Sequence, residues 1–186
     1  MQLQLLPKYV QYLATHETRF LGLQLIRYLS QKAENDSDNI IASIIQTQIV
    51  PSLLVIASDI HYSLDVRNEA SWILINISFS SKNHCDYLIT KGLLPFILKL
   101  LANKDTEEII QNNVMWIVQN IVVDDTTTRD YLLSHNVVSY LNAGMACHNL
   151  IQIASNALKN LVFIGYEFYL SMIFNKGNET EAMCNM

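Results

Sequence analysis

The chain has 186 residues, of which 51% are hydrophobic and only 16% are charged, with five glycines and three prolines. This composition fits one helical domain with a buried core and excludes a disordered chain or a loop-rich β fold. The net charge of −5 arises in residues 100–186, where four Lys/Arg face nine Asp/Glu, and this acidic half disfavours nucleic acid as a direct partner.

A 44-residue repeat organises the chain from its start. Pro7, Pro51 and Pro95 are evenly spaced, and proline is tolerated in the first turn of a helix, so each predicts the start of a short helix. A polar break and a longer helix follow, expected at about 66–78 in the second repeat and 107–122 in the third. These longer helices are called third helices below.

A further short helix is predicted ahead of Pro51, of Pro95 and of Ser139, which stands 44 residues after Pro95. The segments are "SDNIIASII", "KNHCDYLIT" and "TTTRDYLLS". Gly92 and Asn136 follow the last two segments at equivalent places, and both residue types tolerate the left-handed backbone of a helix end. We therefore expect three helices per repeat, except in the first repeat, which lacks its first helix.

A period of 40–47 residues with two or three helices is typical of armadillo and HEAT proteins, and proline at the second helix favours armadillo. The sequence predicts an all-α fold, a right-handed armadillo-repeat α-solenoid of about four repeats with degenerate first and last repeats. One domain, 1–174, is expected, with a polar and disordered tail at 175–186. Its repeats are placed at about 3–36, 37–80, 81–124 and 125–164, with a terminal cap at 165–174.

Two Trp/Asn pairs recur in the predicted third helices. Trp72 and Asn76, then Trp116 and Asn120, are each four residues apart and share a helix face. The pair is broken in the fourth repeat, where Asn156 precedes Asn160. Either these side chains line a shared face, or the tryptophans belong to the core and the asparagines hold neighbouring repeats together.

The segments "EASWILINIS", "MWIVQNIVVDD", "RDYLL" and "NALKNL" resemble the armadillo repeats of the importin-α (karyopherin-α) family, over about residues 5–164. The resemblance implies a concave groove that binds Lys/Arg-rich nuclear localisation signals as extended peptides, for nuclear import. By this resemblance, the tryptophans contact basic side chains, the asparagines bond the peptide backbone, Asp124 pairs with a lysine, and Asn113 is a further polar groove residue. The candidate peptide-binding residues are Trp72, Asn76, Asn113, Trp116, Asn120, Asp124 and Asn160.

Three further expectations concern partners and location. Importin-β is not an expected partner, because the basic N-terminal segment with which the family binds it is not present. Three dispersed cysteines indicate reduced thiols in the cytoplasm and nucleus, and polar residues throughout the uncharged run 131–158 argue against a membrane span. The alternative function is an armadillo scaffold inside a larger complex, indicated by the apolar run at 161–174.

No catalytic motif is found in the sequence. It contains no Gly-rich phosphate loop, H-E-x-x-H or G-x-S-x-G, and its histidines and cysteines do not have metal-ligand spacing. We therefore expect a protein that is not an enzyme and that needs no metal or cofactor.

Overall fold

The computed structural model describes residues 3–31, 37–123, 125–145 and 150–162, and within these ranges every regular element is a helix. The first helices are α3 (Ser37–Gln46), α6 (Lys82–Thr90) and α9 (Thr126–Ser134). The second helices are α1 (Leu6–Gln11), α4 (Val50–Ser58), α7 (Leu93–Ala102) and α10 (Val137–Met145). The third helices are α2 (His16–Gln31), α5 (Leu64–Ser80), α8 (Glu108–Ile121) and a last helix at 151–162. Two short 3₁₀ turns, η1 (Leu3–Leu5) and η2 (Tyr12–Ala14), flank α1.

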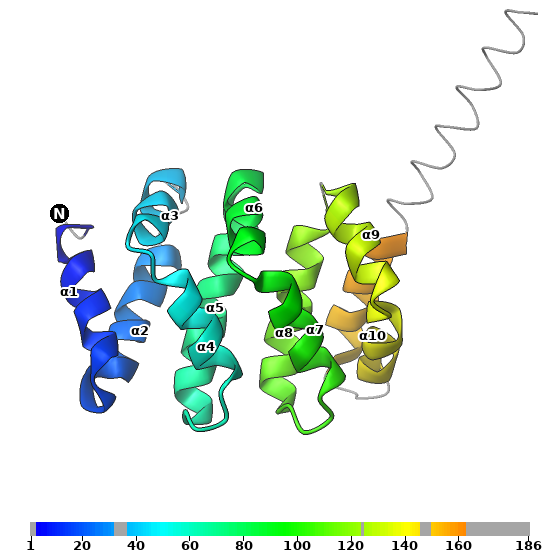
Figure 1. Cartoon of the computed structure of the whole chain (residues 1–186), viewed down its shortest axis with the longest axis horizontal. Helices are drawn as coiled ribbons and strands as arrows, with labels where there is room; N and C mark the ends of the chain where they lie inside the picture. The colour runs from blue at the N-terminus through cyan, green and yellow to red at the C-terminus, as the bar shows by residue number, and fades with distance from the viewer. Residues whose placement is uncertain (1–2, 32–36, 124, 146–149, 163–186) are drawn as a thin grey trace, which may run out of the picture.

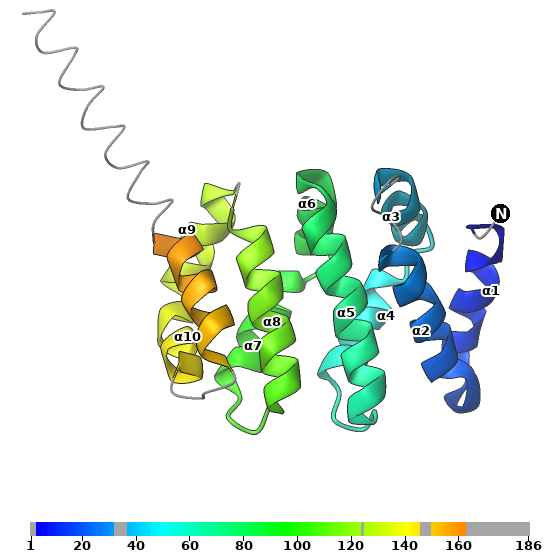
Figure 2. The ribbon, with the colours of Figure 1, turned by 180° about the vertical axis from the view of Figure 1, so that it is seen from behind.

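The repeats stack in a row. Figure 1 shows the second helices α4, α7 and α10 side by side with α3, α6 and α9 above them, and Figure 2 shows the third helices α2, α5 and α8 side by side on the opposite face. One continuous apolar core runs through the row, because each repeat buries its hydrophobic residues against its neighbours. This arrangement confirms the predicted all-α solenoid of about four repeats.

The proline positions open helices as predicted. Pro7 and Pro51 lie in the first turns of α1 and α4, where a missing N–H costs no hydrogen bond. The ends of the third helices differ slightly from the prediction: α5 extends beyond 66–78 at both ends, and α8 is shorter than 107–122 at both ends. Glu107 is extended (ψ 142°) and therefore precedes α8 as its N-cap. The predicted cap at 165–174 and tail at 175–186 lie outside the described residues.

The left-handed helix end recurs in three repeats. Gly92 (φ 99°) and Asn136 (φ 63°) adopt positive φ as predicted, and Gln48 (φ 58°) does the same 44 residues before Gly92. Each closes the turn with its N–H, Gln48 to the Ile45 carbonyl at 3.0 Å and Gly92 to that of Ile89 at 3.0 Å. The sequence does not reveal Gln48, because glutamine has no preference for this backbone.

Gln48→Gly should therefore raise the free energy of unfolding by about 0.5–1 kcal/mol, since glycine adopts positive φ without strain. The Gln48 side chain loses only an exposed, 3.4 Å contact with the Tyr87 hydroxyl. Urea unfolding followed by circular dichroism measures the change. Gln46→Gly, inside α3, is the control and should lower stability by a similar amount; a decrease in both variants would contradict the assignment.

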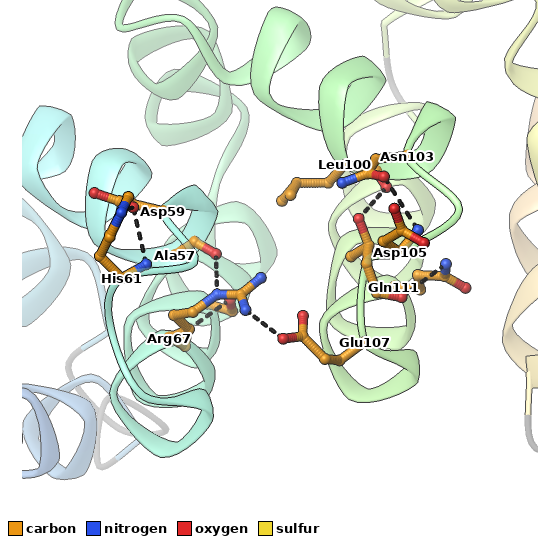
Figure 3. A network of polar contacts seen from close by, with 11 residues as sticks. Ala57, Asp59, His61, Arg67, Leu100, Asn103, Asp105, Glu107 and Gln111 are labelled. Carbon is orange, nitrogen blue, oxygen red and sulfur yellow. Dashed lines mark hydrogen bonds and ion pairs between the residues drawn. The ribbon is translucent and has the colours of Figure 1, made fainter.

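Equivalent turns join the second and third helices of the second and third repeats. The His61 backbone N–H donates to Asp59 Oδ1 at 3.0 Å, and the Asp105 N–H donates to Asn103 Oδ1 at 3.1 Å (Figure 3). The His61 N–H, and then its ring, lower the pKa of Asp59. These Asx turns explain the polar residues of both predicted breaks.

A buried arginine ties the second repeat to the third. The Arg67 side chain is 2% exposed; its Nε donates to the Ala57 carbonyl at 3.3 Å, and its Nη1 donates to Glu107 Oε1 at 2.6 Å (Figure 3). The bond from Arg67 lowers the pKa of Glu107. Arg67 thus connects α4, α5 and the start of α8.

Within the described ranges, no single helix is long and apolar enough to cross a membrane. A pair of helices, residues 39–46 and 50–58, meets the length and composition criteria only when joined across a bend of 81°.

Candidate functional site

The third helices α2, α5 and α8 and the last helix lie side by side and form one face of the solenoid, which we call the third-helix face (Figure 2). Trp72 and Asn76 are on α5, Trp116 and Asn120 are on α8, and Asn160 is on the helix at 151–162. All three asparagines are half-buried. Asp124 lies outside the described residues, so its predicted role stays a prediction.

Asn76 is hydrogen-bonded to the preceding third helix. Its Nδ2 donates to Ser30 Oγ on α2 at 2.8 Å, and the Ser30 hydroxyl donates its single proton to the Arg27 carbonyl at 2.7 Å. Because Ser30 Oγ has no second proton, it can only accept from Asn76. This fixes the amide with Nδ2 toward α2 and Oδ1 directed away from that bond.

The same arrangement recurs one repeat later. Asn120 Nδ2 donates to Ser78 Oγ on α5 at 3.0 Å, and the Ser78 hydroxyl donates to the Ile75 carbonyl at 2.8 Å. At the end of α8 in the third repeat, Val122 stands where Ser78 stands in the second, and Asn160 of the fourth repeat donates from Nδ2 to the Gln119 carbonyl at 3.2 Å instead. A carbonyl also only accepts, so all three amides have the same orientation.

Each asparagine therefore combines the two roles that the sequence left open. One N–H holds the preceding repeat, whereas no described residue donates to Oδ1 of Asn76, Asn120 or Asn160. An amide carries two donors and one acceptor oxygen, so an acceptor and a second donor remain on each residue. Three such groups on successive helices could bond the N–H and C=O groups of an extended chain.

The two tryptophans differ in their surroundings. Trp116 is 39% exposed. Trp72 is half-buried and carries the guanidinium of Arg27 over its ring, with Cζ 4.8 Å from the ring centroid. Arg27 Nη1 also donates to Glu69 Oε1 at 2.9 Å. The chain thus places its own cation on Trp72.

Asn113 is 1% exposed and donates from Nδ2 to Asn68 Oδ1 at 2.7 Å. In this conformation it supports Asn68, which is half-buried on the same face of the solenoid. A direct contact of Asn113 with a peptide stays a prediction.

A shallow depression of about 140 Å³ lies where the C-terminal ends of α5 and α8 meet α6, and Asn120 and Ser78 are part of its lining. Lys82 bonds Asp86 Oδ1 at 2.8 Å, and this bond raises the pKa of Lys82. Asp125 also lines the depression and caps α9 by accepting from the Thr127 N–H at 3.0 Å. Although burial raises the pKa of Asp125, hydrogen bonds from Thr128 and Thr127 and the charge of Lys82 outweigh it and lower that pKa.

Sequence reasoning missed the partners of the asparagines and of Trp72. Ser30 and Ser78 could have been found by their spacing: Ser78 follows Asn76 by two residues, and Ser30 follows by two residues Tyr28, which takes the place of the asparagine on α2. Arg27 and Glu69 carry no comparable signal, since they meet only through the packing of α2 against α5. Within the described ranges, no three His, Cys, Asp or Glu side chains converge as metal ligands would.

Neither a protein-family model nor a curated protein matches the chain. Its structure is similar to a designed armadillo repeat protein in complex with the peptide (KR)4, with a TM-score of 0.70 and 21% identity over 82% of this chain and 62% of that one. A second designed armadillo repeat protein matches with a TM-score of 0.69 and 25% identity over 83% and 63%. This chain therefore spans less than two thirds of either designed protein. The likeness identifies the fold as an armadillo-repeat α-solenoid.

Proposed function

We propose that the third-helix face binds an extended peptide, with the asparagines of three successive helices bonding its backbone. The observation that carries the proposal is the common orientation of these amides: each gives one N–H to the preceding helix and leaves Oδ1 without a described donor. Amides held in advance lose little side-chain entropy on binding, which favours affinity.

Repeat geometry supports backbone recognition. Packed helices lie about 8–10 Å apart, and an extended chain advances about 3.3 Å per residue. Successive asparagines would therefore meet roughly every third residue of the peptide. Because they bond main-chain groups, they hold the peptide without reading its side chains.

We further propose that the peptide is basic and is a nuclear localisation signal, which makes the chain a non-enzymatic import adaptor of the cytoplasm and nucleus. The exposed face of Trp116 suits the stem and charge of Lys or Arg, an attraction of about 0.5–2 kcal/mol. The acidic second half favours such a peptide, and Asp124 is the proposed partner of one lysine. The importin-α resemblance and the (KR)4 complex of the designed relative agree with this choice.

Fluorescein-labelled (KR)4 and (ER)4 peptides test the proposal by fluorescence anisotropy. Wild type should bind (KR)4 more tightly than (ER)4, and more weakly as salt rises. Trp116→Ala should weaken (KR)4 binding about two- to thirtyfold, and Asn120→Ala about two- to tenfold.

Matched controls separate the site from general effects. Tyr131→Ala removes an aromatic ring that is 36% exposed on α9, and Asn83→Ala removes an exposed amide on α6. Both should bind (KR)4 as wild type does. Absence of salt-sensitive (KR)4 binding by wild type, or equal losses in control and site variants, would contradict the proposal.

An armadillo scaffold that packs against another protein is the second candidate. Phe79 on α5 is 81% exposed, and Val162 on the last helix is 58% exposed. Multi-angle light scattering tests this reading: concentration-dependent association that Phe79→Ser or Val162→Ser abolishes would support it. A monomer at all concentrations would count against it.

A further inference from the structure

Arg27, Trp72 and Glu69 form a compact group between α2 and α5. The guanidinium lies 4.8 Å from the Trp72 centroid and 2.9 Å from Glu69 Oε1. The side chains of Arg27 and Glu69 are 26% and 11% exposed. An aromatic face with a carboxylate beside it is a complementary receptor for one guanidinium, and here the chain supplies that guanidinium itself.

The equivalent position one repeat later, at Trp116, has no guanidinium supplied by a described residue of the chain. In the register that aligns Ser30 with Ser78, Arg27 corresponds to Ile75, which is 5% exposed and carries no charge. Trp116 takes the place of Trp72, and its ring is 39% exposed. Asn113 takes the place of Glu69, so amides replace the carboxylate. We call the surroundings of each tryptophan ring a compartment. The compartment of Trp72 is closed by Arg27, and that of Trp116 is open.

We propose that Arg27 is an internal ligand that closes the Trp72 compartment to external cations. A peptide arginine is thereby admitted at Trp116 and not at Trp72, which sets the register of a bound peptide. This inference rests on the proposed peptide-binding function. Removal of Arg27 leaves the Glu69 carboxylate, which is 11% exposed, without its positive partner. A nearly buried carboxylate without a partner strongly favours the binding of another cation.

The first experiment uses a small guanidinium and no peptide. The chain has two tryptophans, so Trp116→Phe leaves Trp72 as the only tryptophan reporter. N-ethylguanidinium should change the fluorescence of Arg27→Ala/Trp116→Phe saturably and leave Trp116→Phe alone unchanged. Adding Glu69→Gln should abolish the response. Circular dichroism checks folding, and Arg27→Gln replaces Arg27→Ala if the latter does not fold.

The second experiment measures (KR)4 affinity. Opening the compartment should make Arg27→Ala bind about two- to thirtyfold more tightly than wild type, the range of one cation–π contact. Arg19→Ala is the matched control: Arg19 is also on α2, stacks on Tyr62 at 4.9 Å and has the same charge. An equal gain in Arg19→Ala would reduce the effect to general electrostatics and contradict the proposal.

The outcomes separate the two ideas. A saturable N-ethylguanidinium response that requires Glu69 supports Arg27 as the occupant, even if no variant binds peptide, in which case the proposed function fails. Peptide binding by wild type without the N-ethylguanidinium response makes Arg27 a purely structural residue. Unchanged or weaker (KR)4 affinity in Arg27→Ala shows that Arg27 does not keep a peptide arginine from Trp72, even if the small guanidinium binds. Either result would overturn this inference and leave the proposed function intact.

Discussion

Glu107→Ala should lower the free energy of unfolding by about 2–3 kcal/mol, whereas Glu108→Ala should change it by less than about 0.5 kcal/mol. The two residues are neighbours, but Glu107 accepts a 2.6 Å bond from Arg67, whose side chain is 2% exposed. Without Glu107, a buried guanidinium loses its charge partner. The loss is smaller than for a fully buried pair, because Glu107 itself is 41% exposed.

Urea unfolding followed by circular dichroism measures both variants. Glu107→Gln, which keeps the shape and removes the charge, should fall between wild type and Glu107→Ala. Equal stability of the two alanine variants would show that the pair does not hold the second and third repeats together.

The free energy of unfolding, measured as a function of pH, should also show the contribution of the Arg67–Glu107 pair at acid pH. Because the bond from Arg67 lowers the pKa of Glu107 below its ordinary value of 4.5, the folded state holds this proton less tightly than the unfolded state. The stabilisation is complete above about pH 4.5 and is lost as the pH falls through the lower folded pKa. Glu107→Gln should therefore lose less stability over that pH range than wild type. If the free energy of unfolding of the two proteins falls in parallel with pH, the loss does not come from Glu107.

Gly22→Ala should destabilise the first repeat by about 1–3 kcal/mol. Gly22 is buried where α2 crosses α1 and η2, and an added Cβ would lie 2.8 Å from both the Tyr12 Cβ and the Tyr9 carbonyl oxygen. The backbone of α1 cannot yield as a flexible side chain would, so α2 must move away. The higher helix propensity of alanine returns at most about 1 kcal/mol.

Gln24→Ala is the control, because Gln24 is exposed on the same helix and its replacement should be neutral or slightly stabilising. Hydrogen exchange should show faster exchange in α1 and α2 of Gly22→Ala, with α8 unchanged, since solenoid repeats depend chiefly on their neighbours. Uniform acceleration along the chain would contradict a local defect.

The sequence predicts the helix order well because its signals are local. Proline in a first turn, glycine or asparagine at a left-handed end, and polar residues in a break all act through their own backbone. The positive φ of Gln48 could not be predicted, because the packing of the repeats imposes this backbone conformation on a residue type that does not favour it. The ends of α5 and α8 shifted because cap positions depend on single residues such as Glu107.

The site is predictable to a smaller extent. Recurrence places Trp72, Trp116 and the asparagines on the stacked third helices, because equivalent positions of a repeat face the same way. The occupant of Trp72 depends on α2 packing against α5, and Arg27 and Glu69 are 42 residues apart in sequence. Such a pairing carries no periodic signal, and neither does the burial of Asn113.

The asparagine–serine bonds have a consequence for how the row could respond to a bound chain. The side chain that would grip the peptide also sets the distance and angle between one repeat and the next. The distance and angle between neighbouring repeats and the spacing of the asparagine amides therefore cannot change independently. Twisting the solenoid would therefore move all three asparagine amides together. A peptide whose backbone spacing matches that of the asparagines would, once bound, make the stack of repeats more rigid.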